Sequence, residues 1–296
     1  MRSADYIRLF GLAAIWGGAF IFMRVLAPVL GAFATADFRV LIAGVVLTAY
    51  ARSVGLESDW RSQWRHYVVI GLLYSGIPFT LYAFAALHLP ASYSAIINSL
   101  TPLFAAVFAA IWLSEPFTSS KLAGLALGVF GVTLVAWHGG APHDPMASWA
   151  VFACVGATIC YGLAGIYTKR FAAHLRPLAI ATFSQLSAGI LLLPLVGASP
   201  PIVPFGATIA LNLLGLAVLC SAVAYVIFYR LIADVGPTRA MTVTFLVPGF
   251  GMLWAALFLG ERVSVTMLVG FGLIVSGTLV VGGTLKAWFR PKPSLA

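Results

Sequence analysis

The sequence predicts an all-α membrane protein with ten transmembrane helices, arranged as two inverted five-helix repeats. Three observations lead to this fold class. Hydrophobic residues make up 61% of the 296-residue chain and charged residues only 8%, whereas soluble domains carry roughly 25% charged residues. A long segment of the chain occurs twice, and the basic residues gather on one side of the predicted spans.

The spans follow from apolar length, because a helix needs about 20 apolar residues to cross a bilayer. Division of the chain at charges, prolines and turn clusters leaves ten such segments. They cover approximately residues 5–26, 33–52, 66–87, 92–113, 119–137, 148–169, 177–197, 207–231, 237–259 and 265–286. The connections between them are short, so we expect no soluble domain.

The repeat is clearest between residues 95–134 and 241–280. At an offset of 146, twelve of the 40 positions are identical. The identical pairs include Pro102 with Pro248, Glu115 with Glu261, Gly124 with Gly270 and Gly131 with Gly277. At an offset of 145, Trp16-Gly17 also aligns with Tyr161-Gly162. The sequence therefore divides into one five-helix repeat at 1–140 and a second at 141–296.

The orientation follows from Lys and Arg, which favour the cytoplasmic ends of spans. With the N-terminus in the cytoplasm, 14 of the 17 basic residues fall on that side, and the loops 138–147 and 198–206 contain none. We therefore expect both termini to be cytoplasmic. Because five is odd, the second repeat enters the bilayer from the opposite side, as in many secondary transporters, whose substrate sites lie near the midplane.

Several function classes lack their signatures. The cysteines Cys154, Cys160 and Cys220 lie in apolar runs without metal or disulfide spacing. No catalytic constellation, HExxH motif or phosphate loop is present, so we expect no enzyme activity, cofactor or metal. The net charge of +9 comes without a basic stripe, so no nucleic-acid partner is expected. The predicted partners are the lipid bilayer and a small-molecule substrate, and the protein is expected to be a monomer.

Polar and aromatic residues inside spans one, three, four, six, eight and nine are candidates for a substrate site, since such residues are costly in a membrane. The candidates are Trp16, Tyr74, Tyr82, Asn98, Ser99, Thr101, Tyr161, Ser221, Tyr225 and Thr244. Any single one of them could instead join two helices. Together, their rings, hydroxyls and amides suit an amphipathic small molecule.

Prolines occur in the middle of three spans, at Pro78, Pro102 and Pro248. Each frees a carbonyl and bends its helix. A static kink is one interpretation. The matching places of Pro102 and Pro248 favour the other, in which the prolines act as hinges.

The acidic residues argue against proton exchange through a buried acid, because no carboxylate is expected at mid-membrane. Asp37 lies near the outer end of the second span, two residues before Arg39. These two are expected to pair, to reach the interface, or to contact a zwitterion at the outer mouth. Glu115 and Glu261 are expected to cap the following helix or to pair nearby. The glycines of the fifth and tenth spans should allow close helix contact; they are Gly124, Gly128, Gly131, Gly270, Gly272 and Gly277.

Two blocks carry a family resemblance: PLFAAVFAAIWLSEPFT with GLALGVFGV, and VPGFGMLWAALFLGERVS with GFGLIVSG. With Trp16-Gly17 and Phe20, they resemble the EamA-type ten-span exporters of the drug/metabolite transporter superfamily. The resemblance covers both halves and implies a ten-helix, inverted-repeat fold that exports metabolites across the bacterial inner membrane.

Within that superfamily the sequence looks most like the YddG-type amino-acid exporters. In these, an aromatic pair flanks the position before the fourth-span proline, where this chain has Ser99 and Thr101. The resemblance therefore implies alternating-access export of a broad range of amino acids, aromatic and other neutral ones included, and of related metabolites. A lipophilic drug or metabolite efflux transporter of the same fold is the alternative.

Overall fold

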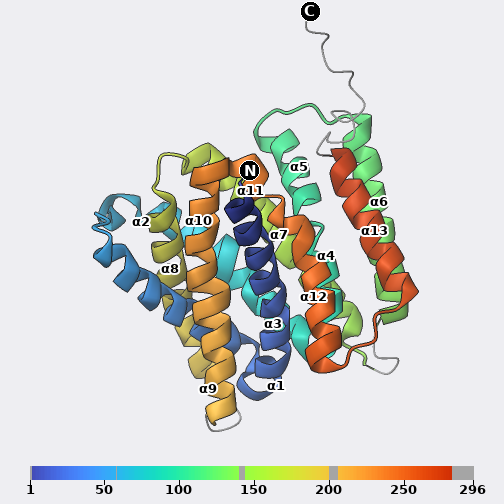
Figure 1. Cartoon of the computed structure of the whole chain (residues 1–296), viewed down its shortest axis with the longest axis horizontal. Helices are drawn as coiled ribbons and strands as arrows, with labels where there is room; N and C mark the ends of the chain where they lie inside the picture. Colours follow the sequence, from blue (N-terminus) through green and yellow to red (C-terminus); the bar gives the residue numbers. More distant parts are fainter. Residues whose placement is uncertain (1, 58, 140–143, 200–205, 282–296) are drawn as a thin grey trace, which may run out of the picture.

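The computed structural model describes residues 2–57, 59–139, 144–199 and 206–281, and the regular elements in these ranges are all helices (Figure 1). Seven helical stretches are long and apolar enough to cross a membrane. Two further apolar helices are shorter, α12 (Val243–Leu259) and α13 (Val265–Val281). The chain is therefore an all-helical, multi-pass membrane protein, as its composition predicts.

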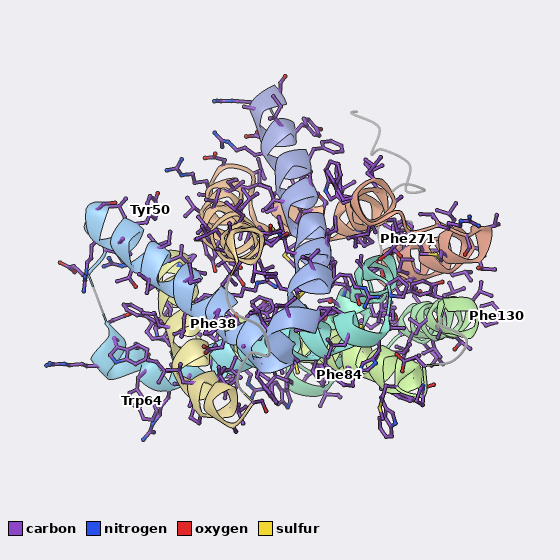
Figure 2. All side chains as sticks on the ribbon, turned by 90° about the horizontal axis from the view of Figure 1, so that it is seen from below. Phe38, Tyr50, Trp64, Phe84, Phe130 and Phe271 are labelled. Carbon is purple, nitrogen blue, oxygen red and sulfur yellow. The ribbon has the colours of Figure 1, made fainter. Side chains whose placement is uncertain are left out.

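Helix α1 (Ser3–Ser53) contains both the first and the second predicted spans in 51 residues. Gly31 interrupts its helical geometry with φ 79° and ψ 167°. A positive φ carries no steric penalty for glycine, so the chain bends here. Figure 2 shows the two parts of α1 running in different directions, with Tyr50 at the far end of the second part.

Two long helical stretches contain π-helical segments. The third predicted span corresponds to α2 (Trp60–Gly71), η1 (Leu72–Gly76) and α3 (Ile77–His88). The eighth corresponds to α9 (Ala207–Leu214), η2 (Gly215–Val223) and α10 (Ala224–Val235). The two π segments occupy matching places at the offset of 146, and such segments are frequent at functional sites.

The fourth and ninth predicted spans are each broken in two. Ser99 and Leu100 separate α4 (Ala91–Asn98) from α5 (Thr101–Trp112). In the second half, a two-residue turn separates α11 (Pro237–Ala240) from α12.

The remaining helices are continuous: α6 (Ser119–Gly139), α7 (Ala147–Phe171) and α8 (Pro177–Ala198). Helices α6 and α13 lie side by side at one edge of the molecule (Figures 1 and 2). The predicted tenth span extends to 286, and its last five residues, Lys286 among them, lie outside the described residues, as do Arg290 and Lys292.

Glycines bring α6 and α13 together, as the sequence predicts. A Cβ on Gly124 would lie 2.5 Å from the carbonyl oxygen of Gly277, and one on Gly131 would lie 2.8 Å from that of Gly270. At the offset of 146, Gly124 corresponds to Gly270 and Gly131 to Gly277, so the two contacts are counterparts of each other. Since the residue number rises along one helix as it falls along the other, the two helices are antiparallel. The expectation is wrong for Gly272, where a Cβ would meet nothing within 4 Å, because this residue lies outside the helix contact.

Two more pairs of contacts are related in the same way. Gly44 in the second part of α1 packs against Leu186 of α8, and Gly189 of α8 packs against Leu41 of α1. The close approach of Gly17 to Phe250 and Gly251 corresponds to that of Gly162 to Phe104 and Ala105. In each case a helix of one half packs against a helix of the other.

Candidate functional site

Arg39 is buried in the interior between α1, α3 and η2, with 5% of its surface exposed. Its Nε donates a hydrogen bond to Ser221 Oγ at 2.9 Å, and its Nη1 approaches Met23 Sδ at 3.8 Å. Its Cζ lies 3.6 Å from the centre of the Phe79 ring. Tyr161 and Tyr225 lie close enough to interact with its charge. Of the predicted site residues, Ser221, Tyr161 and Tyr225 therefore surround this cation.

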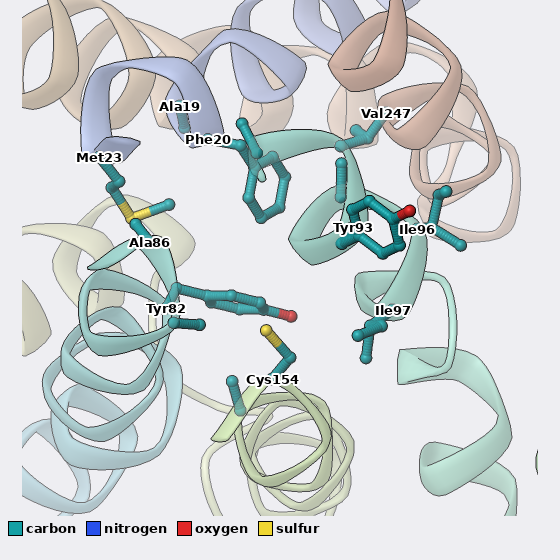
Figure 3. Packing of buried hydrophobic residues seen from close by; sticks show 14 of the residues in the cluster. Ala19, Phe20, Met23, Tyr82, Ala86, Tyr93, Ile96, Ile97, Cys154 and Val247 are labelled. Atoms are coloured by element: carbon teal, nitrogen blue, oxygen red, sulfur yellow. The ribbon is translucent and has the colours of Figure 1, made fainter. Parts of the chain in front are cut away.

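Tyr161 of α7 joins Arg39 to two other predicted residues. Its ring centre lies 6.2 Å from that of Tyr74 and 6.2 Å from that of Tyr82. The Tyr82 hydroxyl donates to Asn98 Oδ1 at 3.0 Å, at the point where α4 ends. Figure 3 shows the Tyr82 ring facing Phe20, with its hydroxyl directed between Cys154 and Ile97.

Trp16 joins the same group from the first part of α1. Its ring lies 6.4 Å from Tyr225 and 5.2 Å from Phe228, measured between ring centres. At the repeat offsets, the pair Trp16–Phe228 corresponds to the pair Tyr161–Tyr82. We call the whole set the arginine–tyrosine cluster; its members are Trp16, Arg39, Tyr74, Phe79, Tyr82, Asn98, Tyr161, Ser221 and Tyr225.

Of the three remaining predicted residues, only Thr101 has a described contact with a cluster member, and that contact is to the backbone of Asn98. The Thr101 hydroxyl donates to the carbonyl of Asn98 at 2.9 Å, and so satisfies the acceptor that Pro102 leaves without a backbone donor. The Thr244 hydroxyl donates to the carbonyl of Met241 at 2.8 Å. The carbonyl of Ser99 accepts a hydrogen bond from Thr278 of α13 at 3.4 Å. Thr101 and Thr244 thus bond to backbone carbonyls near them in the chain, and the Ser99 carbonyl joins the break in the fourth span to α13.

The three prolines occupy different structural positions. Pro78 lies in the first turn of α3, directly after η1, and Pro102 lies in the first turn of α5, after the break. Pro248 lies inside the continuous helix α12. Thus Pro78 and Pro102 follow irregular backbone, whereas Pro248 does not, and the hinge role remains a prediction.

Two of the three expectations for Arg39, pairing with a carboxylate and reaching the interface, are wrong, and contact with a zwitterion stays a prediction. Among the described residues no carboxylate pairs with it, and at 5% exposure it does not reach the interface. Asp37 is fully buried, and neither of its carboxylate oxygens has a partner among the described residues. Two residues correspond to about 200° around a helix, so the two side chains leave α1 on nearly opposite sides.

Sequence reasoning also missed Phe79 as part of the cluster. Gln185 of α8 is not among the predicted site residues; it is fully buried, and among the described residues neither its Oε1 nor its Nε2 has a partner. Ala181 and Ala188 share its helix face, and they belong to the buried clusters against which Tyr225 and Tyr161, respectively, pack. Gln185 therefore lies on the face of α8 that is directed toward the cluster.

Glu261 makes the strongest polar contact between the two halves. Its carboxylate accepts hydrogen bonds from the N–H of Ala91 at 2.7 Å, the N–H of Ser92 at 3.0 Å and the Ser92 hydroxyl at 2.5 Å. It thus caps α4, a helix of the other half, and not the helix that follows it. We call this the Glu261 contact.

Glu115, the counterpart of Glu261, lies at the opposite end of the molecule, at the end of α5 (Figure 1). Its carboxylate pairs with Lys121 Nζ at 3.3 Å and with Lys169 Nζ at 3.5 Å, and its side chain is 42% exposed. It therefore pairs nearby, as the sequence predicts.

An apolar groove of about 530 Å³ lies between α1, the stretch from α9 to η2, and α12, and is lined by Phe22, Trp254 and Phe258 among others. It contains none of the predicted site residues. In the ranges that the structure describes, no group of three His, Cys, Asp or Glu residues is placed to hold a metal ion.

Comparison with known proteins identifies related sequences and a related fold. The sequence profile of the EamA-like transporter family matches residues 5–137 and 148–283. A "Probable terminal-alkyne amino-acid exporter" of Streptantibioticus cattleyicolor is 26% identical over 272 residues, which cover 90% of this chain and 89% of that protein. A "Probable amino-acid metabolite efflux pump" of Escherichia coli is 26% identical over 202 residues, 65% of this chain and 67% of that protein.

A solved structure titled only as a crystal structure of a protein has the same fold, with a TM-score of 0.65. It covers 98% of this chain and 100% of its own, at 19% sequence identity.

Proposed function

Because the chain belongs to the EamA-like transporter family, we propose that it exports amino acids and related metabolites by alternating access. In this proposal it is a secondary transporter of the bacterial inner membrane. Ten spans form two inverted five-helix repeats, at 1–140 and 141–296, and both termini are cytoplasmic. The substrate is bound by the arginine–tyrosine cluster.

The observation that carries the proposal is the set of contacts related by the repeat offset. A twofold axis relates two copies of a segment when a contact from residue i to residue j is accompanied by one from the counterpart of j to the counterpart of i. Gly124–Gly277 with Gly131–Gly270, and Gly44–Leu186 with Gly189–Leu41, both follow this pattern. Antiparallel pairing of equivalent helices supports inversion. The bend at Gly31, which separates two spans inside α1, supports the count of ten.

The Glu261 contact supports alternating access. If the halves are inverted, Glu261 lies at the outer end and closes it by joining α4, while Glu115 lies at the cytoplasmic end. In the opposite state, Glu115 would take the matching place at the start of α11, where Pro237 corresponds to Ala91 and therefore offers one N–H fewer. The structure then represents a state closed to the outside, and the exchange of the two contacts opens one end as it closes the other.

The cluster supports a small polar substrate with an apolar part. It combines a cation, hydroxyls and an amide with the rings of six aromatic residues from four helical stretches. The two related exporters with amino-acid names point the same way. Ser99 and Thr101 leave the fourth span without bulky aromatics there, which favours a broad range of side chains.

Transport by purified protein in liposomes tests the proposal. Radiolabelled L-leucine, L-phenylalanine and L-threonine should leave protein-containing vesicles at least about ten times faster than protein-free ones. Absence of flux for all neutral amino acids, together with efflux of lipophilic dyes, would instead support the drug-efflux alternative.

Two alanine variants locate the site. Tyr82→Ala removes the hydrogen bond to Asn98 and two ring contacts, and Trp16→Ala removes the contacts to Tyr225 and Phe228. Each should lower amino-acid flux severalfold in folded protein. Tyr6→Ala is the matched control, because Tyr6 is 50% exposed at the start of α1. Normal kinetics in both cluster variants would place the substrate elsewhere.

A further inference from the structure

We propose that Arg39 binds the carboxylate of the transported molecule and that the substrate's ammonium group is dispensable. The inference rests on the proposed transport function and names the substrate class: small monocarboxylates with an apolar or aromatic part, amino acids being one group among them.

The charge of the cluster requires an anion. Arg39 brings one positive charge into the interior, and its partners there are a hydroxyl, a thioether and a phenyl ring. Removing an ion from water is costly unless a counter-charge and hydrogen bonds compensate. Among the described residues no acid does so. An intramembrane charge without a protein partner indicates a ligand of opposite charge.

The geometry selects a planar carboxylate. A guanidinium has five N–H donors in a fixed fork. Nε is occupied by Ser221, Nη1 faces Met23 Sδ at 3.8 Å, and Phe79 covers one face of the group. Each terminal nitrogen has two N–H groups, so each keeps at least one for a ligand. A ligand therefore approaches along the edge formed by the two terminal nitrogens, in the plane of the guanidinium. Two parallel hydrogen bonds to the oxygens of one carboxylate fit that edge.

An ammonium group meets no comparable partner. Asp37 leaves α1 on nearly the opposite side from Arg39, and the other cluster members are uncharged aromatics, Ser221 and Asn98. Tyrosine and tryptophan faces attract a cation only weakly compared with a carboxylate. The Gln185 side chain, which has no hydrogen-bond partner among the described residues, is neutral as well. The cluster as a whole thus favours a negative ligand over a zwitterion and excludes a cation.

The repeat indicates one anchor per molecule. At the offset of 145, Arg39 corresponds to Ser184, whose hydroxyl bonds to the carbonyl of Ala181 in its own helix. Ser221 corresponds to Ser75 at the offset of 146. The cluster's one cation therefore has no charged counterpart in the other half, so a single carboxylate is bound.

Thermal unfolding of the purified protein with three matched small ligands tests the inference without transport. Phenylacetate, phenylacetamide and phenethylamine share one ring and differ in charge. At 10 mM, phenylacetate should raise the unfolding temperature by about 2 °C or more, because a ligand that binds only the folded state stabilises it. The amide and the amine should give no shift. Equal shifts with the acid and the amide would overturn the inference.

Variants at position 39 separate binding from a structural role. Arg39→Gln should weaken phenylacetate binding at least about thirtyfold, and Arg39→Lys should retain part of it. Without ligand, Arg39→Gln should unfold no earlier than the wild type, because it removes a buried unpaired charge. Arg24→Gln is the matched control: Arg24 also lies in α1 and donates to the carbonyl of Ala86, and this variant should bind phenylacetate normally. Loss of stability in both position-39 variants, with unchanged phenylacetate binding in Arg39→Lys, would make Arg39 a structural residue.

Transport competition distinguishes this inference from the proposed function. Unlabelled N-acetyl-L-phenylalanine should inhibit L-phenylalanine efflux, and L-phenylalanine methyl ester should not. If the ester inhibits as well as the free amino acid, transport stands and the carboxylate anchor fails. If wild-type vesicles transport no amino acid while the phenylacetate shift is present, the anchor stands and the proposed function fails.

Discussion

The two halves of the molecule use the same helix contacts and differ in their polar ones. Glycine and leucine contacts between the halves occur in related pairs. Glu261, in contrast, caps a helix of the other half with three hydrogen bonds, whereas its counterpart Glu115 pairs with the half-buried Lys121 and the exposed Lys169. Apolar packing thus follows the repeat, while one carboxylate contact distinguishes the two ends.

The π segments show that the halves can share a geometry without sharing its local sequence. In the first half, Pro78 follows η1 directly. In the second half, the corresponding residue is Ala224, and η2 is present all the same. The proline is therefore not the cause of the π-helical geometry, which must depend on packing against α1 and α7 or on the apolar residues themselves.

The largest expected effect concerns the packing that the halves share. Gly277→Ala would place a methyl group 2.5 Å from the carbonyl oxygen of Gly124, a backbone atom that cannot move aside easily. Overpacking of this kind costs about 1–3 kcal/mol. Gly131→Ala, its counterpart, should cost a similar amount. Gly272→Ala is the control, because its methyl group would meet nothing within 4 Å.

Thermal unfolding in detergent measures all three glycine variants. Similar losses for Gly277→Ala and Gly131→Ala would support the twofold relation between the α6 and α13 contacts. A loss in only one of them would argue against it. Helix propensity alone favours alanine over glycine, so a loss in Gly272→Ala would show that these variants lose stability by a route other than the clash.

The second effect concerns the Glu261 contact. Glu261→Gln weakens three hydrogen bonds to a charged acceptor, each worth about 1.5–3 kcal/mol when lost. The conformational equilibrium should therefore shift toward opening of the Glu261 end by at least about tenfold. Glu115→Gln should leave that end closed, because Glu115 makes only exposed ion pairs, which contribute little.

Cysteine labelling can measure this shift. Ser94→Cys introduces a thiol on α4, next to the Glu261 contact and 3% exposed, in a background whose three native cysteines are replaced by alanine. In Glu261→Gln, a membrane-impermeant maleimide applied from the Glu261 side should label it at least about ten times faster. Equal labelling rates in the two glutamine variants would remove the role proposed for Glu261.

The sequence predicted the helices and the aromatic part of the cluster because both depend on local patterns. Apolar length defined the spans, and the repeat offset made Trp16 and Tyr161 counterparts. The sequence did not predict the burial of Arg39, because the depth of this residue depends on the bend at Gly31 and on the direction of the second part of α1. Its partner Ser221 is 182 residues away in the sequence. The hydroxyls of Thr101 and Thr244 bond to nearby backbone carbonyls, which composition does not reveal, and their part in substrate binding stays a prediction.

A smaller effect is expected at the prolines, where the halves also differ. Pro102→Ala supplies an N–H that can bond the Asn98 carbonyl and so join α4 to α5. This should lower the maximal transport rate severalfold and leave KM nearly unchanged. Pro248→Ala should change the rate less than about twofold, since α12 is already continuous. Equal effects of the two variants would indicate that both prolines act as static kinks or both as hinges.

The smallest effect concerns the contact between His88, three residues before α4 begins, and Asp144. His88 Nδ1 lies 2.9 Å from Asp144 Oδ2, in the connection before α7. The hydrogen bond from His88, and next that from the N–H of Met146, hold the pKa of Asp144 below its ordinary value. A lowered folded pKa means that the stabilisation is present above the unfolded pKa of about 3.9 and is lost as the pH falls through the folded value.

Asp144→Asn should therefore lower the unfolding temperature by about 2 °C or less at pH 7, since the pair is solvent-accessible. The difference from wild type should vanish in acid. A difference that persists below the folded pKa would assign the effect to the connection's backbone geometry and not to charge. In that case Glu261 alone would account for the polar closure of this end of the molecule.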